Sequence, residues 1–218
     1  MMQPPSYAIA FDMDGVIFRT TRPKHDAMLS LFPGATKEVA SDEIMSMSGV
    51  PRGQKLTRVY ERCFGRTPSG AELQALLQKY EVALRVVLAD PVVTPGIKSF
   101  LERSSSQCFV CSSAPLEEVE RQLQIAGLEK RFERAYGAPT SKTQALQDVS
   151  RRVGHMDVVF FGDATADLKA AKDAGCAFVA VVGETDQFPE SPTPRVADFV
   201  NDVVVLDAIN CALVANAA

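Results

Sequence analysis

The chain has 218 residues, of which 46% are hydrophobic and 23% charged, and its formal net charge at pH 7 is −4. This composition is typical of an ordinary globular protein with a well-buried core in one or two domains. A weakly acidic chain lacks the basic surface that nucleic-acid binding requires, and no apolar run reaches the roughly 18 residues of a membrane-spanning helix. We therefore expect neither nucleic acid nor membrane as a partner.

The start of the chain and its cysteines bear on the compartment. The segment Met1–Pro5 has no basic residue, and the apolar run that follows it stops at Asp12, so we expect no secretory signal. The five cysteines are odd in number and lack regular spacing, which favours reduced thiols in a cytoplasmic protein. Cys108 and Cys111 match C-x-x-C, but residues three apart in a strand face opposite sides, so we interpret them as core thiols rather than a redox or metal pair.

The first predicted element is a short buried strand from Tyr7 to Phe11. Asp12 and Asp14 follow it two residues apart, and the period of a strand starts them on the same side. Gly15 then lets the chain leave the strand with unusual dihedrals. Two neighbouring carboxylates repel each other, and a divalent cation with oxygen ligands is the usual compensation. The alternative is a strand end with solvated acids.

Residues 19–92 carry only helical patterns. The apolar spacing, the capping box that starts at Ser69 and the stop at Asp90-Pro91 mark the helix ends. Helices are expected around residues 23–32 and 41–48, between Pro51 and Gly65, and in a long run after Ser69.

From residue 93 onward, apolar runs alternate with helical patterns. Alternation at this spacing indicates a parallel sheet in an α/β layer fold. Strands are predicted at residues 108–112, 134–137, 157–161 and 177–182, with a last one after about 197; helices are predicted at about 97–104, 115–127, 142–153 and 166–174, with a last one ending near 214.

The simplest arrangement places the first strand in the same sheet as the later ones. The fold class is then α/β, with a discontinuous parallel-sheet core formed by residues 1–18 and 93–218. Residues 19–92 become an all-helical cap domain inserted after the first strand.

Polar residues follow three of the predicted strands at their carboxyl ends. Ligands of open parallel sheets bind outside this edge, so the three groups are expected to converge there. They are Asp12 and Asp14 after the first strand, Ser112 and Ser113 after the second, and Gly162-Asp163, with Asp167 four residues on, after the fourth.

Lys142 begins a predicted helix and could be a surface lysine. Several carboxylates at one edge would repel a phosphate, however, so a metal ion and a lysine there make electrostatic sense. The segment Ser112–Pro115 adds hydroxyls and amides at a helix N-terminus, where anions bind, and Ser112 is equally consistent with a helix N-cap.

These motifs resemble those of the haloacid dehalogenase superfamily, in its phosphatase-type branch with a helical cap, which includes phosphoglycolate phosphatase-like and β-phosphoglucomutase-like members. The resemblance covers nearly the whole chain, with the cap between the first and second motifs. In the family's order, the motifs are Asp12-Met13-Asp14-Gly15, Ser112, Lys142 and the segment Gly162–Asp167.

The resemblance implies a Rossmann-like core and a mechanism. Asp12 would be the nucleophile that forms an aspartyl phosphate, and Asp14 the acid and base. Members that cleave carbon–halogen or carbon–phosphorus bonds lack an acid at the position of Asp14, so its presence favours phosphate esters.

The resemblance also implies a metal and a phosphate site. A Mg²⁺ cofactor would be held by Asp12, the carbonyl of Asp14 and Asp163, with Asp167 orienting Lys142 or a metal-bound water. Lys142 and Ser112 would bind the phosphoryl group. Two departures from the family pattern are Thr143 after the lysine, where many relatives have proline, and Ser113, which leaves open which serine hydroxyl contacts phosphate.

Substrate choice is expected to come from the cap. Arg52, in Gly49-Val50-Pro51-Arg52, resembles an arginine that binds a second phosphate in sugar-phosphate mutases of this family; a solvated helix arginine is the alternative. The other cationic candidates are Arg19, Arg22, Lys24, His25 and Lys55.

The favoured function is a Mg²⁺-dependent phosphatase acting on a small phosphorylated metabolite, such as a sugar phosphate or a phosphoglycolate-like ester. The alternatives are a phosphosugar mutase, with His25 or Lys24 as the base, and a non-catalytic metabolite-binding module. The sequence is compatible with a monomer or a homodimer.

Overall fold

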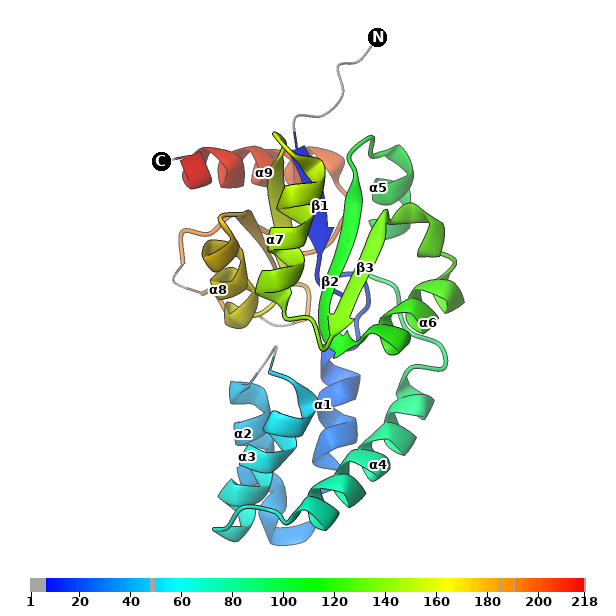
Figure 1. Ribbon diagram of the computed structural model, residues 1–218, viewed down its shortest axis with the longest axis vertical. Helices are drawn as coiled ribbons and strands as arrows, with labels where there is room; N and C mark the ends of the chain where they lie inside the picture. Colours follow the sequence, from blue (N-terminus) through cyan, green and yellow to red (C-terminus); the bar gives the residue numbers. More distant parts are fainter. Residues whose placement is uncertain (1–6, 48–49, 185, 190, 218) are drawn as a thin grey trace. The chain divides into compact units, whose positions relative to one another are not determined.

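The computed structural model describes residues 7–47, 50–184, 186–189 and 191–217 (Figure 1). The chain divides into two compact units. The core unit comprises the residues up to Arg19 and those from Val92 onward, and the helical unit comprises Thr20–Pro91.

The described part of the core unit contains one parallel sheet in the order β3-β2-β1-β4-β5-β6, as expected from the alternating pattern. The first strand therefore lies in the middle of the sheet, between β2 and β4. Two strands differ from the prediction by two residues or more, because β2 runs on to Pro115 and the last strand begins at Arg195 and ends before residue 197, while the other strand ends differ by at most one residue. The strands are β1 (Tyr7–Phe11), β2 (Cys108–Pro115), β3 (Arg134–Ala138), β4 (Asp157–Gly162), β5 (Ala177–Val181) and β6 (Arg195–Val196).

Helices cover both faces of this sheet (Figure 1). Their apolar sides pack into two hydrophobic clusters, one on each face. One cluster takes α5 (Ile97–Arg103), α6 (Leu116–Ala126) and α9 (Asp202–Ala217), and the other takes α7 (Lys142–Val153) and α8 (Thr165–Ala174). A short 3₁₀ helix, Glu129–Arg131, follows α6.

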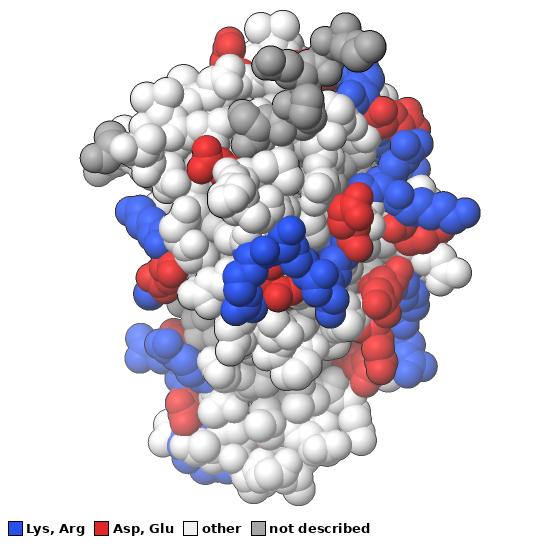
Figure 2. All heavy atoms as spheres, turned by 45° about the horizontal axis from the view of Figure 1, so that its top comes forward, with Lys and Arg blue, Asp and Glu red and all other residues white. Residues whose placement is uncertain are grey.

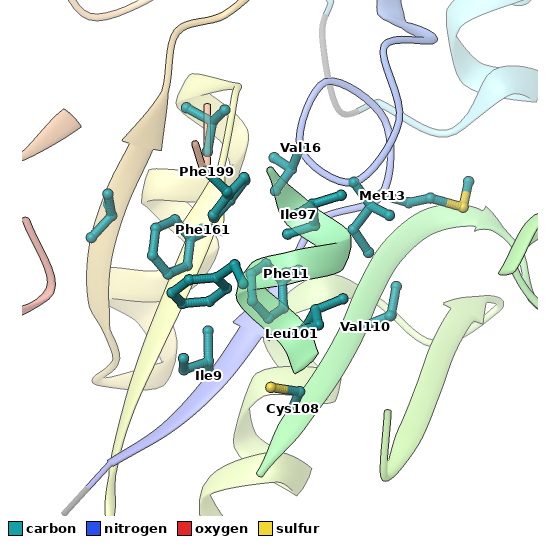
Figure 3. Close-up of a cluster of buried hydrophobic side chains, with 14 of the residues drawn as sticks. Ile9, Phe11, Met13, Val16, Ile97, Leu101, Cys108, Val110, Phe161 and Phe199 are labelled. Carbon is teal, nitrogen blue, oxygen red and sulfur yellow. The ribbon is translucent and has the colours of Figure 1, made fainter. Parts of the chain in front are cut away.

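Successive side chains of β1 point to opposite faces of the sheet. Ile9 and Phe11 point into the first cluster, while Ala8 and Ala10 point into the second, against the side of α7. Phe11 stacks on Phe161 with ring centroids 5.4 Å apart, in the cluster that Figure 3 shows. A strand buried on both faces is a continuous apolar run, which is how this segment reads in the sequence.

The C-x-x-C cysteines are buried on opposite faces of the sheet, Cys108 in the first cluster and Cys111 in the second. Burial raises the pKa of both thiols, that of Cys108 to about 12. They pack as apolar groups, and the five cysteines of the chain are free.

The helical unit has its own apolar cluster, to which its four α-helices contribute. Ser69 and Glu72 form the expected capping box, and Gly65, with φ of 69°, ends the preceding helix. The helices are α1 (Thr21–Leu29), α2 (Lys37–Ser46), α3 (Arg52–Phe64) and α4 (Gly70–Val87), with a 3₁₀ helix at Gly34–Thr36. The prediction for α2 was several residues late, and its last residue, 48, lies outside the described residues.

Acidic and basic side chains are interspersed on the face that Figure 2 shows. None of the helices that the structure describes combines the length and the apolar character needed to span a membrane.

Candidate active site

The carboxyl edge of the sheet gathers polar side chains from three neighbouring strands, β2, β1 and β4. Asp12 directly follows the central strand and is only 4% exposed. Its amide donates to the carbonyl of Phe161 at 2.8 Å, which continues the pairing with β4. Gly15, with φ of 78°, then turns the chain, and its amide donates to the carbonyl of Phe18 at 2.7 Å. Asp14, inside this turn, is half-buried.

The end of β4 and the first turn of α8 supply two further carboxylates. Oxygen atoms of Asp12, Asp163 and Asp167 all lie within 4.8 Å of one another, and the three residues are buried. Asp167 can come this close because Gly162 has no side chain: a Cβ there would lie 2.5 Å from the Cβ of Asp167. The sequence motif contains Gly162, but this close approach is visible in the structure alone.

Lys142 is the first residue of α7 and is 9% exposed, so it is not a surface lysine. Its Nζ lies 2.9 Å from Oδ2 of Asp12 and also donates to Oδ1 of Asp167. The helix start is fixed by a capping box in which Ser141 Oγ accepts from the amide of Gln144 at 3.3 Å. This capping box fixes the backbone from which the Lys142 side chain reaches the two carboxylates.

The serines of β2 take different positions at the same edge. Ser112 is 2% exposed, and its Oγ accepts a hydrogen bond from the amide of Ala114 at 3.1 Å. Ser113 is half-buried. Helix α6 begins directly after Pro115, so hydroxyls and a helix N-terminus occur together, as the sequence predicts.

Burial dominates the electrostatics of the carboxylates. It raises the pKa of Asp12 to about 7, against the lowering effect of Lys142, and raises the pKa of Asp163 well above its usual value. Burial alone would lower the pKa of Lys142, but the carboxylates of Asp12 and Asp167 outweigh this effect and raise it. In their ionised forms, the three carboxylates exceed the single ammonium by two negative charges. Oxygen donors with such an excess fit a hard divalent cation such as Mg²⁺.

The cationic candidates from the sequence divide between the two units. Arg52 and His25 lie in the helical unit, so their relation to Asp12 stays a prediction. The guanidinium of Arg52 stands over the ring of Tyr80, 5.7 Å from its centroid. The Nδ1 of His25 lies 3.0 Å from Oδ1 of Asp26. Arg19 belongs to the core unit.

The fold and the site together define a class: an α/β protein with a doubly covered parallel sheet whose candidate reactive groups, carboxylates and a lysine, lie at the carboxyl edge of that sheet. Residues 9–181 match the family model of the haloacid dehalogenase-like hydrolases, and the chain belongs to this family. By this family description it is a hydrolase-type enzyme.

Known proteins agree with this assignment. A phosphoglycolate phosphatase from Synechococcus elongatus is 29% identical over 181 residues, which are 80% of this chain and 82% of the relative. A predicted phosphoglycolate phosphatase from Haemophilus somnus has a similar structure, with a TM-score of 0.75 and 17% identity over 94% of this chain and 100% of the other. A β-phosphoglucomutase from Clostridium difficile has a TM-score of 0.73 and is 17% identical, and the match covers 95% of this chain and 98% of the other. At such identities, the two structures support the fold.

Proposed function

We propose that the protein is a Mg²⁺-dependent phosphatase that hydrolyses a small phosphorylated metabolite through an aspartyl phosphate on Asp12. The observation that carries this proposal is the position of the Asp12 carboxylate, buried at the end of the central strand and 2.9 Å from the Lys142 ammonium. A carboxylate held beside a fixed cation, with two more carboxylates within 4.8 Å, fits a nucleophile that attacks a phosphate ester.

The two chemical steps use Asp12 and Asp14. In the first, an oxygen of Asp12 attacks phosphorus, the bond from phosphorus to the ester oxygen breaks, and Asp14 gives its proton to the leaving alcohol. In the second, Asp14 takes a proton from a water molecule, which attacks phosphorus and releases inorganic phosphate. Asp12 returns as a carboxylate, so each turnover consumes one water molecule.

The proposed metal residues are Asp12, Asp163 and the backbone carbonyl of Asp14, with Asp167 close by. Bound Mg²⁺ would supply neutralisation of the charge on the transferring phosphoryl group. Asp167 accepts from Lys142 and also from the amide of Ala164 at 3.2 Å, so its proposed role is to hold Lys142 in position.

Lys142 and the serines of β2 are the proposed phosphate ligands. The hydroxyl proton of Ser112 is available to a phosphate oxygen because its Oγ acts as an acceptor toward Ala114. Comparing Ser112→Ala with Ser113→Ala distinguishes the two hydroxyls: the serine that contacts phosphate is the one whose loss raises KM for every ester.

Arg52 and His25 are proposed to take part in substrate recognition from the helical unit. If Arg52 binds a distal anion, Arg52→Ala raises KM for esters with a second charged group. Unchanged KM values across a panel of esters would exclude this role.

The experiment that tests the function is inorganic phosphate release from a panel of small phosphate esters, with Mg²⁺ and with chelator. The panel includes 2-phosphoglycolate because a curated relative is a phosphoglycolate phosphatase. We expect release that requires Mg²⁺ and is abolished in Asp12→Asn. Asp14→Asn should lower turnover by about 10²–10⁴-fold.

Two results would contradict the proposal. A rearranged sugar phosphate in place of free phosphate would identify a phosphosugar mutase. Near-normal turnover by Asp14→Asn would overturn the acid and base role of this residue.

A further inference from the structure

Arg19 follows the active-site turn and belongs to the core unit. Its amide donates to the carbonyl of Val92 at 2.8 Å, where the two segments that join the units run side by side. Among the described residues, its buried Nε has no hydrogen-bond partner, and the guanidinium makes no ion pair. Arg19 as a whole is half-buried, but an unpaired buried donor such as its Nε is costly.

The backbone places Arg19 close to Asp14. Asp14 and Phe18 form a β-bridge, and Arg19 is the next residue. Bridged residues lie about 5 Å apart and consecutive Cα atoms about 3.8 Å apart, so the Cα of Arg19 is within roughly 9 Å of the Cα of Asp14. This distance is within the reach of an arginine side chain.

The guanidinium also lies at the carboxyl edge of the sheet. Its Nη2 is 3.9 Å from where a Cβ would stand on Gly183, which lies two residues after the end of β5. A side chain at Gly183 would meet the carbonyl oxygen of Ala197 at 2.3 Å, so this backbone is packed closely. Arg19 is thus anchored in the core unit, on the edge that carries Asp12 and Asp163.

We propose that Arg19 is a specificity-determining residue that binds a second anionic group, a carboxylate or a phosphate, on the leaving-group side of the substrate. This inference rests on the proposed function, in which Asp14 protonates the leaving oxygen. Because the backbone of Arg19 directly follows the bridge to Asp14 and its guanidinium lies on the same sheet edge, its side chain can reach the part of the substrate beyond that oxygen. The planar guanidinium matches carboxylate and phosphate oxygens in bidentate geometry, and such a ligand would satisfy the unpaired Nε.

The test compares esters that differ in the second anion alone. One pair is 2-phosphoglycolate and 2-hydroxyethyl phosphate, and the other is propane-1,3-diol bisphosphate and its monophosphate. A charged hydrogen bond corresponds to about 10- to 150-fold in affinity. In Arg19→Ala we therefore expect kcat/KM for the member of the preferred pair that carries the second anionic group to fall at least tenfold more than for its partner, mainly through KM. The pair with the larger effect tells whether the second anion is a carboxylate or a phosphate.

Two further variants separate recognition from general effects. Arg19→Lys keeps the positive charge but removes the planar guanidinium. It should retain part of the preference for the ester with the second anion over its partner. Arg134→Ala removes a positive charge at the start of β3, at the opposite edge of the sheet, and should leave the ratio between paired esters unchanged. Equal losses for both members of each pair in Arg19→Ala would overturn the proposal and identify a structural role.

A binding measurement keeps this inference separate from the proposed function. If the wild-type protein releases no phosphate from any ester, the proposed function fails. Calorimetric titration of Asp12→Asn with each ester in Mg²⁺ then still reports on Arg19. Tighter binding of the ester with the second anionic group, lost in Asp12→Asn/Arg19→Ala, supports the role, and equal binding of paired esters overturns it.

Discussion

At the Asp12 side chain, burial and the charge of a neighbouring lysine oppose each other. The sheet removes its carboxyl group from water, which raises its pKa to about 7, while Lys142 stabilises the ionised form. Nucleophilic attack requires that ionised form, so the reaction depends on cations that the fold brings to the carboxyl edge.

This balance predicts a pH dependence of stability in metal-free protein. The pKa of Asp12 is 3.8 without perturbation and about 7 in the folded chain, so the folded state binds the proton more tightly. The contribution of Asp12 to the free energy of unfolding is therefore fully present below about pH 4, and it is lost as the pH rises to about 7. Urea unfolding in chelator should show the free energy of unfolding of the wild type falling across this window relative to Asp12→Asn. A constant difference between the two proteins would contradict the burial effect.

A second prediction concerns Gly162, where there is no room for a side chain beside Asp167. A methyl group there would lie 2.5 Å from the Cβ of Asp167 and displace the carboxylate that holds Lys142. Gly162→Ala should lower kcat/KM at least tenfold, since small misplacements of catalytic groups cost up to about 10²-fold. Gly70→Ala is the matched control, because a Cβ at Gly70 has no neighbour within 4 Å. Equal phosphate release by the two variants would show that Asp167 tolerates the displacement.

Helix starts place the functional groups of the core unit. Lys142 is the first residue of α7, Asp167 lies in the first turn of α8, and α6 begins beside the serines of β2. Each helix follows the carboxyl end of a strand, so its N-terminus faces the same edge as the strand end. Caps at these positions therefore affect both stability and catalysis.

Two capping boxes allow the effect of a helix cap on stability and on catalysis to be measured separately. Ser141→Ala and Ser69→Ala each remove a side-chain cap and should each destabilise the protein by about 0.5–2 kcal/mol. We expect Ser141→Ala also to lower kcat/KM, because Lys142 follows the cap directly, whereas Ser69→Ala acts on α4 in the helical unit. Urea unfolding and phosphate release on both variants give the comparison. An unaltered kcat/KM in Ser141→Ala would show that the ion pairs alone hold Lys142.

The whole chain contains two units with separate hydrophobic clusters, and the proposed metal ligands belong to the core unit. A ligand that binds the folded state stabilises the unit that holds it. Unfolding of a chain with two such units need not be a single transition.

Mg²⁺ should therefore raise the melting temperature of the core unit. At a concentration 100 times its Kd, the metal raises the free energy of unfolding by about 2.7 kcal/mol. For a chain of this size, that corresponds to an increase in melting temperature of roughly 5–10 °C. Calorimetric scans with Mg²⁺ and with chelator measure the shift. Asp163→Asn should show a smaller one, and an equal shift in both proteins would place the metal elsewhere.

The sequence by itself determined the class of fold and the order of the reactive groups. Periodicity, caps and turn glycines depend on residues a few positions apart, so the capping box at Ser69 and the start of α7 at Lys142 could be predicted to the residue. Polar residues at strand ends gave the active edge because parallel strands share it.

The tertiary structure alone decided what those residues touch. Asp12 and Lys142 are 130 positions apart, and their 2.9 Å contact depends on packing α7 against the sheet, which no local pattern encodes. The same holds for the close approach at Gly162 and for the buried Nε of Arg19, which has no hydrogen-bond partner in the part of the chain that the structure describes. Local chemistry fixes where an element begins, whereas burial and pairing arise when distant elements meet.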